Sequence, residues 1–515
     1  MFSFSPIKKN LDSLAFAAAG FFIIYLFTRH NGIGICPDAV IYTTGAENLI
    51  TNGSFTDFKH EPIIDFPAFY SIFLAGISWI TGSKIIAFAP YLNAFLFALV
   101  IFLAGNIMER FEFRSKWYKA AALSCIVLSP GLLEVYSMMW SETLFILFIM
   151  FFVMAMHRYL QSNSKKALIA AAVITALACI TRYVGITIIA TGGILILFNS
   201  KLSFRKRFID GMIFFIIGSS LFAINLYRNY QLSGTLTGDR LPSVTPLITN
   251  IHHAGVVFSN WLPFANGNYA MTIVLTIGMI AILIMICLKQ FLKHRRIANY
   301  ESIAAFFALF YVSFMIVTAT LSRFETLNSR FISPPFIFLV WSVSSWLVPF
   351  FQRMKMPAKK WSLSALGIVM LLGFQWNQLA ADAETWDGVK DAGIPGYTED
   401  GWTRSETVLF VENDSLFFKK DYTIYSDAYD ALWWFTKRPG QFLPAKEDQD
   451  CQQEFLEDPH CYVVWFDDGE DDDRVDKDFL TQTKKMKLVK QFSDGAIYEY
   501  DSTNYATRIT RIETN

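Results

Sequence analysis

The feature that most constrains this chain is its series of long apolar runs, because runs of this length are typical of segments that cross a bilayer. Hydrophobic residues make up 53% of the 515 residues and charged residues 17%, which is too apolar for a soluble domain. The runs and their basic flanks predict eleven spanning helices, at about residues 11–29, 84–108, 119–137, 139–157, 167–181, 183–198, 208–227, 270–288, 301–320, 331–351 and 362–381. The predicted fold class is an all-α polytopic membrane protein over residues 1–381, followed by a small C-terminal α/β domain.

The orientation of these helices follows from their connecting segments, because cytoplasmic connections are rich in Lys and Arg. Alternate connections, together with Lys8 and Lys9, hold 21 Lys and Arg, whereas the intervening connections hold eight. The positive-inside rule therefore places the N-terminus in the cytoplasm. An odd number of spans then places the C-terminal domain on the outer side of the membrane.

The C-terminal part is acidic, with 15 Lys and Arg against 30 Asp and Glu from Asp382 onward. Residues 382–404 are expected to form a linker and residues 405–515 the α/β domain. The expected strands are TVLFV, TIYSD, CYVVWF, KLVKQF and AIYEY, and the last two form a hairpin at an Asp-Gly turn. Nucleic acid is not expected as a partner, because an outward acidic domain repels phosphates. Cys451 and Cys461 are close enough in sequence to form a disulfide if the domain faces an oxidising space.

Arg182 interrupts an apolar stretch that holds no other charged residue between Ala167 and Ser200. The 32 residues 167–198 would make one helix of about 48 Å, which is too long for a hydrocarbon core of about 30 Å. Because both flanks are basic, the stretch is expected to be a hairpin with Arg182 at its outward turn, next to a helix N-terminus that attracts anions. Two roles fit this position: binding of a lipid-linked phosphate, and an anchoring contact with lipid headgroups.

Two carboxylates are expected at the same outer surface. Ser141 and Glu142 begin a predicted helix, where Ser141 can cap the backbone and the helix dipole stabilises Glu142. Glu142 can therefore be a simple capping acid. However, Glu134, Glu142 and Arg182 all fall at the outer rim, and ionisable residues at membrane depth usually face a cavity. The sequence thus also predicts a shared cavity at this rim.

The first outer loop, residues 30–83, carries a third carboxylate. Pro37 suits the first turn of a helix, and Asp38 and Tyr42 recur at helical spacing, which predicts a short amphipathic helix on the membrane surface. A second apolar stretch at residues 67–79 is expected to lie along the interface and not to cross it. Asp38 is then held over the outer rim, where it can either remove a proton from an acceptor hydroxyl or amine or simply cap its helix.

Five segments together resemble the GT-C superfamily of polyprenyl-phosphate-dependent glycosyltransferases. They are PDAVIYTTGAENLITNG, PAFYSIFLAGISWITG, WSETLFILF, TRYVG and RFISPP, within a similarity that covers about residues 10–381. The likeness is strongest to protein O-mannosyltransferases and the lipid A aminoarabinose transferase. The mannosyltransferases carry adjacent Asp and Glu in the first loop, whereas Ala39 follows Asp38 in this chain.

The resemblance implies inverting transfer of a sugar from a polyprenyl-phosphate donor to a lipid, glycan or protein acceptor. It also implies a bacterial inner membrane, with the C-terminal domain in the periplasm and membrane lipids as neighbours. By this resemblance, Asp38 would act as base or orient the acceptor. Glu142 would support the acceptor or a divalent cation, and Arg182 and Arg330 would hold the donor phosphate. The identity of any metal stays open.

A departing phosphate gains negative charge, and preorganised guanidinium groups lower the barrier to its departure. Besides Arg182 and Arg330, Arg240 in the long outer loop 228–269 is a candidate for this role. The residues expected to line the substrate cleft are Tyr42, Glu134 and Tyr183. His252 and His253 lie in the same long loop, but adjacent histidines point in different directions on most backbones, so a role without metal is favoured.

Two other classes of protein compete with a glycosyltransferase. A polytopic transporter or flippase of a lipid-linked or anionic substrate also combines apolar helices with charges at the rim. Transporters bind near the midplane between repeated, broken helices, whereas the charges here gather at one rim and no pair of broken spans repeats. The third class is a scaffold without catalytic activity, for which Asp38 would be dispensable.

Overall fold

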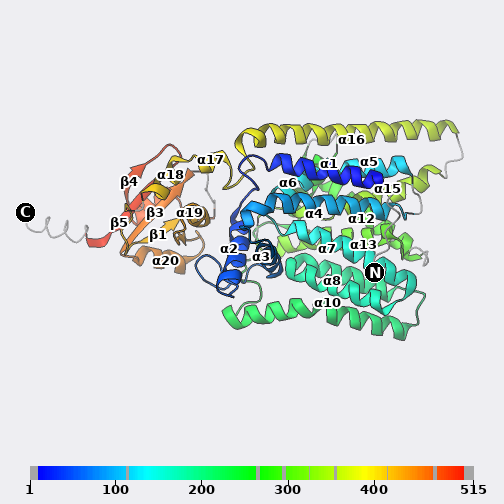
Figure 1. Ribbon diagram of the computed structural model, residues 1–515, viewed down its shortest axis with the longest axis horizontal. Helices are drawn as coiled ribbons and strands as arrows, with labels where there is room; N and C mark the ends of the chain where they lie inside the picture. The colour runs from blue at the N-terminus through cyan, green and yellow to red at the C-terminus, as the bar shows by residue number, and fades with distance from the viewer. Residues whose placement is uncertain are drawn as a thin grey trace, which may run out of the picture.

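The structure of the protein is a computed structural model that describes residues 10–111, 115–262, 267–292, 297–323, 325–352, 357–414, 416–467 and 473–503. Lys8 and Lys9, on which the predicted orientation partly rests, lie outside the described residues. Figure 1 shows a bundle of long helices with a small sheet domain at one end, and the helices α2 and α3 between the two.

The body is helical and contains α1 to α16. The bounds of its helices are α1 Leu11–Phe27, α2 Pro37–Thr51, α3 Phe69–Thr81, α4 Ile85–Met108, α5 Lys116–Val127, α6 Pro130–Ser137, α7 Glu142–Ser162, α8 Lys165–Thr181, η2 Tyr183–Gly185, α9 Ile186–Leu197, α10 Phe204–Ser233, α11 Leu247–Asn260, α12 Tyr269–Leu292, α13 Tyr300–Leu321, α14 Ser329–Ile332, α15 Phe336–Gln352 and α16 Pro357–Ala392. Each of the eleven predicted apolar runs overlaps at least one of these helices. The two helices expected in the first outer loop are present as α2 and α3.

Five of the helices, α4, α7, α10, α12 and α13, are long and apolar enough to cross a membrane. The pair α5 and α6 adds a sixth span if the two helices, bent by 50° at their break, are counted together. The apolar helices make the chain an integral membrane protein. The number of eleven spans stays a prediction, because α1, α9 and the apolar part of α15 have at most 17 residues, which is shorter than the helices that clearly cross a bilayer.

The C-terminal domain is built on a five-stranded sheet in the order β2-β1-β3-β5-β4. Its elements are α17 Asp400–Thr403, α18 Glu406–Asn413, β1 Thr423–Ser426, α19 Tyr429–Thr436, β2 Gln441–Phe442, α20 Gln449–Glu457, β3 His460–Phe466, η4 Phe479–Thr483, β4 Lys487–Gln491 and β5 Gly495–Asp501. β1 pairs in parallel with β2 and β3, whereas β5 pairs antiparallel with β3 and β4. The predicted hairpin of the last two strands is therefore confirmed.

One predicted strand of this domain is wrong. TVLFV forms part of helix α18, because the Ser405 side chain accepts a hydrogen bond from the Val408 N–H, 3.1 Å away, and caps the helix. The buried residues Thr407, Val408 and Val411 then lie on one helical face. Cys451 and Cys461 are not joined, and Cys461 is buried in β3 while Cys451 is exposed.

The residues expected to act as a linker, 382–404, continue α16 to Ala392 and then turn into the short helix α17. They contact the first outer loop directly: the Tyr397 N–H donates to the Ile35 carbonyl at 2.8 Å, and the Thr398 hydroxyl donates to the Ile33 carbonyl at 3.0 Å. Phe58 of the same loop stacks on Trp433 of α19, with 5.1 Å between ring centroids. The C-terminal domain is thus packed against the loop that carries Asp38.

At the far end of the bundle, a buried lysine ties three helices together. Lys119 of α5 lies 2.7 Å from a carboxylate oxygen of Asp12 in α1 and 2.7 Å from one of Glu109 at the end of α4. A lysine side chain is rarely buried unless it is paired. The pairs therefore fix the packing of α5 against the closely packed α1 and α4.

We expect Lys119→Ala to destabilise the protein by about 1–3 kcal/mol, because the change removes two ion pairs, with Asp12 and with Glu109, from a partly buried place. The measurement is the midpoint of thermal unfolding of the purified protein in detergent. Lys116→Ala, in the same helix but exposed, is the matched control and should change the midpoint little. Equal midpoints for the two variants would contradict the role of Lys119.

Candidate active site

The site begins with a backbone pairing between the first outer loop and the connection from α6 to α7. The Gly34 N–H donates to the Ser137 carbonyl at 2.9 Å, and the Met139 N–H donates to the Gly34 carbonyl at 3.0 Å. A side chain at Gly34 would collide with Met138, whose sulfur lies 2.1 Å from where a Cβ would be, so glycine suits this close approach. Asp38 and Glu142 each follow four residues after the paired Gly34 and Met138, so the pairing brings both acids together.

Four charged side chains form a continuous chain of ion pairs, which we call the ion network. Glu142 lies in the middle: one carboxylate oxygen is 2.6 Å from Nη1 of Arg182, and the other is 2.8 Å from Nε of Arg330. A second nitrogen of Arg330 pairs with the Asp38 carboxylate. The Glu142 side chain is 0% exposed, whereas Asp38 is 23% and Arg182 15% exposed. The network therefore has two partly accessible ends and a fully buried centre.

Arg182 reaches Glu142 because the chain turns back immediately after α8. Its backbone is extended, with φ −149° and ψ 137°, between the end of α8 and the short helix η2. Gly185 is needed at this reversal, since a Cβ there would lie 2.7 Å from the Cα of Cys179. The location of Arg182 at a turn between two helices, as predicted, is thus confirmed, and the same turn aims its guanidinium at α7.

Ser141 has a different role from the predicted one. Its side chain makes no capping hydrogen bond to α7. Instead, its hydroxyl oxygen accepts a hydrogen bond from Nη1 of Arg182 at 2.9 Å and lies 3.1 Å from the Tyr42 hydroxyl. Burial raises the pKa of Tyr42, and the neighbouring Asp38 carboxylate raises it further, so the phenol stays neutral. Tyr42 is therefore joined to the ion network through Ser141.

Arg330 lies in the short helix α14 and is held by groups from three directions. Besides Asp38 and Glu142, its guanidinium lies over the Trp140 ring, 4.3 Å from the centroid, and 3.7 Å from a Glu325 oxygen. Burial alone would lower the pKa of Arg330, but the Glu142 and Asp38 carboxylates raise it, so the guanidinium stays charged. The structure adds Trp140 and Glu325 to the predicted residues. In the sequence, these two residues are marked only by lying near residues already predicted: Trp140 precedes Ser141, and Glu325 lies five residues before Arg330.

The remaining predicted residues lie outside the ion network. Glu134 of α6 accepts a hydrogen bond from the Ser329 hydroxyl next to Arg330. The Tyr183 hydroxyl turns away from the network, donates to the Ile64 carbonyl at 2.9 Å and accepts from Asn229 at 3.1 Å. Arg240 is exposed and donates to the Asp65 carbonyl at 3.4 Å. Tyr183 and Arg240 therefore contact the first outer loop.

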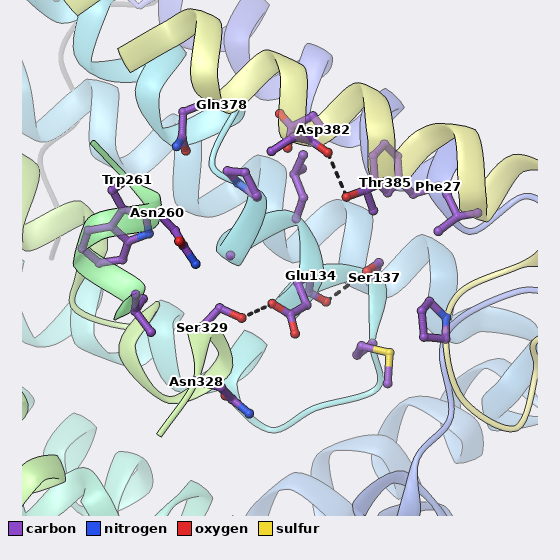
Figure 2. A pocket seen from close by; sticks show the side chains of 18 of the residues that line it. Phe27, Glu134, Ser137, Asn260, Trp261, Asn328, Ser329, Gln378, Asp382 and Thr385 are labelled. Carbon is purple, nitrogen blue, oxygen red and sulfur yellow. Dashed lines mark hydrogen bonds between the residues drawn. The ribbon is translucent and has the colours of Figure 1, made fainter. Parts of the chain in front are cut away.

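A cavity of about 780 Å³ adjoins the network (Figure 2). Its walls come from α6, α11, α16 and the segment from Glu325 to Ser329. Trp140 and Glu325 line it and also contact Arg330, so the cavity borders the ion network at these two side chains. Glu134, which was expected to line a cleft, faces this cavity.

A divalent cation does not fit the ion network. Metal ions need free carboxylate oxygens, but both Glu142 oxygens face guanidinium groups and Asp38 pairs with Arg330. Across the part of the chain that the structure describes, no group of three or more His, Cys, Asp and Glu side chains is arranged to hold a metal. His252 lies in helix α11, and its Nδ1 is 2.6 Å from the hydroxyl oxygen of Thr272 in α12.

No protein-family model matches this sequence, and no curated protein matches it. Solved structures do match. The crystal structure of ArnT from Cupriavidus metallidurans in the apo state has a TM-score of 0.54 at 12% sequence identity, over 95% of this chain and 98% of ArnT. The same protein bound to undecaprenyl phosphate gives a TM-score of 0.51 at 12% identity, over 94% of this chain and 97% of ArnT.

The archaeal oligosaccharyltransferase AglB from Archaeoglobus fulgidus, in complex with an inhibitory peptide and a dolichol-phosphate, gives a TM-score of 0.51 at 10% identity, over 90% of this chain and 70% of AglB. These likenesses show that the chain shares the fold of ArnT and AglB, a GT-C-like fold. The fold resemblance that the sequence motifs suggested is therefore confirmed, and the chemistry of the site rests on this chain's own residues.

We expect Glu142→Gln to destabilise the protein by about 3–5 kcal/mol, because it removes the carboxylate paired with Arg182 and leaves Arg330 paired mainly with Asp38. The measurement is thermal unfolding of the purified protein in detergent. Glu325→Gln is the matched control. This carboxylate is exposed and lies 3.7 Å from Arg330, which is a long and therefore weak ion pair, so the change should cost less than about 1 kcal/mol. A Glu142 variant as stable as the Glu325 variant would show that Glu142 does not hold the site together.

Proposed function

We propose that the protein transfers a sugar from a polyprenyl-phosphate donor to a hydroxyl or amine of a lipid, glycan or protein acceptor, with inversion, at the outer face of a bacterial inner membrane. The observation that carries this proposal is the ion network, which combines an accessible carboxylate with an accessible guanidinium at the end of the bundle where α2 and the C-terminal domain lie (Figure 1). The fold supports it, since ArnT binds undecaprenyl phosphate and AglB binds dolichol-phosphate.

In this proposal Asp38 is the base. It is the more accessible carboxylate of the network, and it pairs with the Arg330 guanidinium. As the acceptor oxygen or nitrogen attacks the anomeric carbon, its proton passes to Asp38. The bond from the anomeric carbon to the phosphate oxygen breaks at the same time, and both electrons leave with the polyprenyl phosphate. Attack opposite the leaving group inverts the anomeric carbon.

Arg182 receives the departing phosphate. Its Nε–H has no hydrogen-bond partner among the described residues, although Nη1 is engaged by Glu142 and Ser141. A buried donor without a partner is costly, and a phosphate oxygen would satisfy it with a charge-assisted hydrogen bond. Negative charge grows on the phosphate in the transition state, so this contact strengthens as the sugar leaves.

Glu142 is a positioning residue in this scheme and not a catalytic one. Its fully buried carboxylate cannot touch a substrate, but it orients both guanidinium groups. Arg330 in turn orients Asp38. Base and phosphate-binding group are therefore placed relative to each other through one buried acid.

We expect Asp38→Asn to lower the rate of sugar transfer by about 100-fold or more, because general-base catalysis contributes that much, while binding of the donor lipid stays within about twofold. The measurement is transfer of labelled sugar from the polyprenyl phosphate that co-purifies with the protein, identified by mass spectrometry. Glu47→Gln, on the exposed side of the same helix α2, is the matched control and should keep the wild-type rate. Transfer at the wild-type rate by Asp38→Asn would contradict the role of Asp38 as the base, and absence of transfer by the wild-type protein would favour a transporter or a scaffold.

We expect Arg182→Lys to weaken binding of undecaprenyl phosphate about tenfold, because lysine cannot keep the Glu142 pair and also donate from the position of Nε. The measurement is direct binding of undecaprenyl phosphate to the protein in nanodiscs, with the unfolding midpoint checked for each variant. Arg240→Lys, outside the ion network, should weaken binding less. A larger effect at Arg240 than at Arg182 would move the phosphate site to the 228–269 loop.

A further inference from the structure

The cavity beside the ion network has an unusual balance of charge. Three carboxylates line it, from Glu134 in α6, Glu325 before α14 and Asp382 in α16. Among the described residues that line it there is no Lys, Arg or His. In Figure 2, Gln378 and Asp382 lie on the α16 wall, and Asn328 and Ser329 lie across the hollow. An anion entering this space would be repelled from several sides.

Three polar atoms of the lining are buried without any hydrogen-bond partner among the described residues. They are Oδ2 of Asp382, Oε1 of Gln378 and Oδ1 of Asn328. Asp382 is 7% and Gln378 1% exposed, so water reaches them poorly. The amide nitrogen of Asn328 donates a hydrogen bond to a Glu325 carboxylate oxygen at 2.8 Å, and this bond shows which end of the amide is the oxygen. Unpartnered buried polar atoms are costly, and clusters of them indicate a missing partner.

Two of these atoms are amide oxygens and the third is a carboxyl oxygen, so together they favour a partner that brings hydrogen-bond donors. A phosphate offers acceptor oxygens and negative charge, so it matches neither the free atoms nor the carboxylates. A sugar offers several hydroxyl donors, and an amino sugar adds an ammonium group that pairs with carboxylates. The aromatic rings of Trp140, Trp261 and Phe27 line the same cavity and can pack against the apolar face of a sugar ring.

We propose that this cavity binds the sugar part of a substrate through hydrogen bonds donated to Asp382, Gln378 and Asn328. The inference rests on the proposed function and deepens it, because it separates the sugar site from the phosphate site. The volume of about 780 Å³ is typical of small-molecule sites. Trp140 lies between the cavity and Arg330, so a sugar held there lies next to the charged groups that act on it.

The first test is ligand binding without turnover. Glucose, glucosamine and inorganic phosphate are added to the full-length protein in nanodiscs, and binding is followed by saturation-transfer NMR. We expect both sugars to bind and Gln378→Leu to raise their dissociation constants at least fivefold. Asp387→Asn, exposed on the same helix α16, is the matched control and should leave binding unchanged. Failure of both sugars to bind the wild-type protein, or unchanged binding by Gln378→Leu, would overturn the proposal.

Asp382→Asn distinguishes the two sugar chemistries. A selective loss of glucosamine binding, at least fivefold, identifies an ammonium contact, and an equal loss for both sugars identifies a hydroxyl contact. The same variant should have an unfolding midpoint equal to or above that of the wild type, because it replaces a buried carboxyl oxygen that has no partner among the described residues with a neutral amide of nearly the same size. A clearly lower midpoint would make Asp382 a structural residue and overturn its role, as would phosphate binding that depends on Gln378.

The outcome separates this inference from the proposed function. Sugar binding that depends on Gln378 in a protein that transfers no sugar would contradict only the proposed function. Sugar transfer by a protein whose Gln378→Leu and Asp382→Asn variants bind sugars normally would contradict only the cavity assignment.

A third comparison identifies the source of the sugar. If the polyprenyl carrier with its sugar attached loses affinity in Gln378→Leu and the bare carrier does not, the cavity holds the donor sugar; otherwise it holds the acceptor glycan.

Discussion

The interaction on which the rest of the site depends is the buried Glu142 carboxylate between two guanidinium groups. A carboxylate with 0% exposure requires counter-charges, and the folded chain supplies them from the turn after α8 and from α14. Asp38 neutralises the remaining charge of Arg330. The four formal charges cancel, so the network exerts little long-range attraction on an anion. Its selectivity for an anion must come from short-range features, above all the Arg182 Nε–H, which has no hydrogen-bond partner in the described part of the chain.

A second feature of the site is that hydrogen-bond donors and hydrogen-bond acceptors lie on different sides of Trp140. The side with Arg182 and Arg330 offers N–H groups, whereas the cavity side offers oxygens of Glu134, Asp382 and their neighbours. A sugar phosphate has the same division, with hydroxyl donors on the sugar and acceptor oxygens on the phosphate. Burial strengthens this complementarity, because hydrogen bonds in a dry site gain more than those in water.

Sequence patterns predicted what depends on local periodicity and on the membrane. The apolar runs located the helices of the body, and the length of residues 167–198 placed Arg182 at a turn. They could not predict which charges pair, because Arg330 is 292 residues from Asp38 and 188 from Glu142. The same limit explains Ser141, whose hydroxyl contacts Arg182 and Tyr42 instead of capping α7. TVLFV shows the opposite limit: a short apolar segment fits a strand or a helix, and the Ser405 cap decides for the helix.

The contact between residues 396–398 and the first outer loop joins segments that lie far apart in the sequence. Gly396, at φ 122°, lets the chain approach so closely that a Cβ would lie 2.3 Å from the Ile35 carbonyl oxygen, three residues before Asp38. During synthesis the Asp38 loop is made well before residue 396. The loop therefore lacks this brace in every nascent chain that ends before residue 396. A ribosome that stalls before this point leaves a chain whose Asp38 loop is unbraced, so the geometry of the site depends on synthesis at least as far as residue 398.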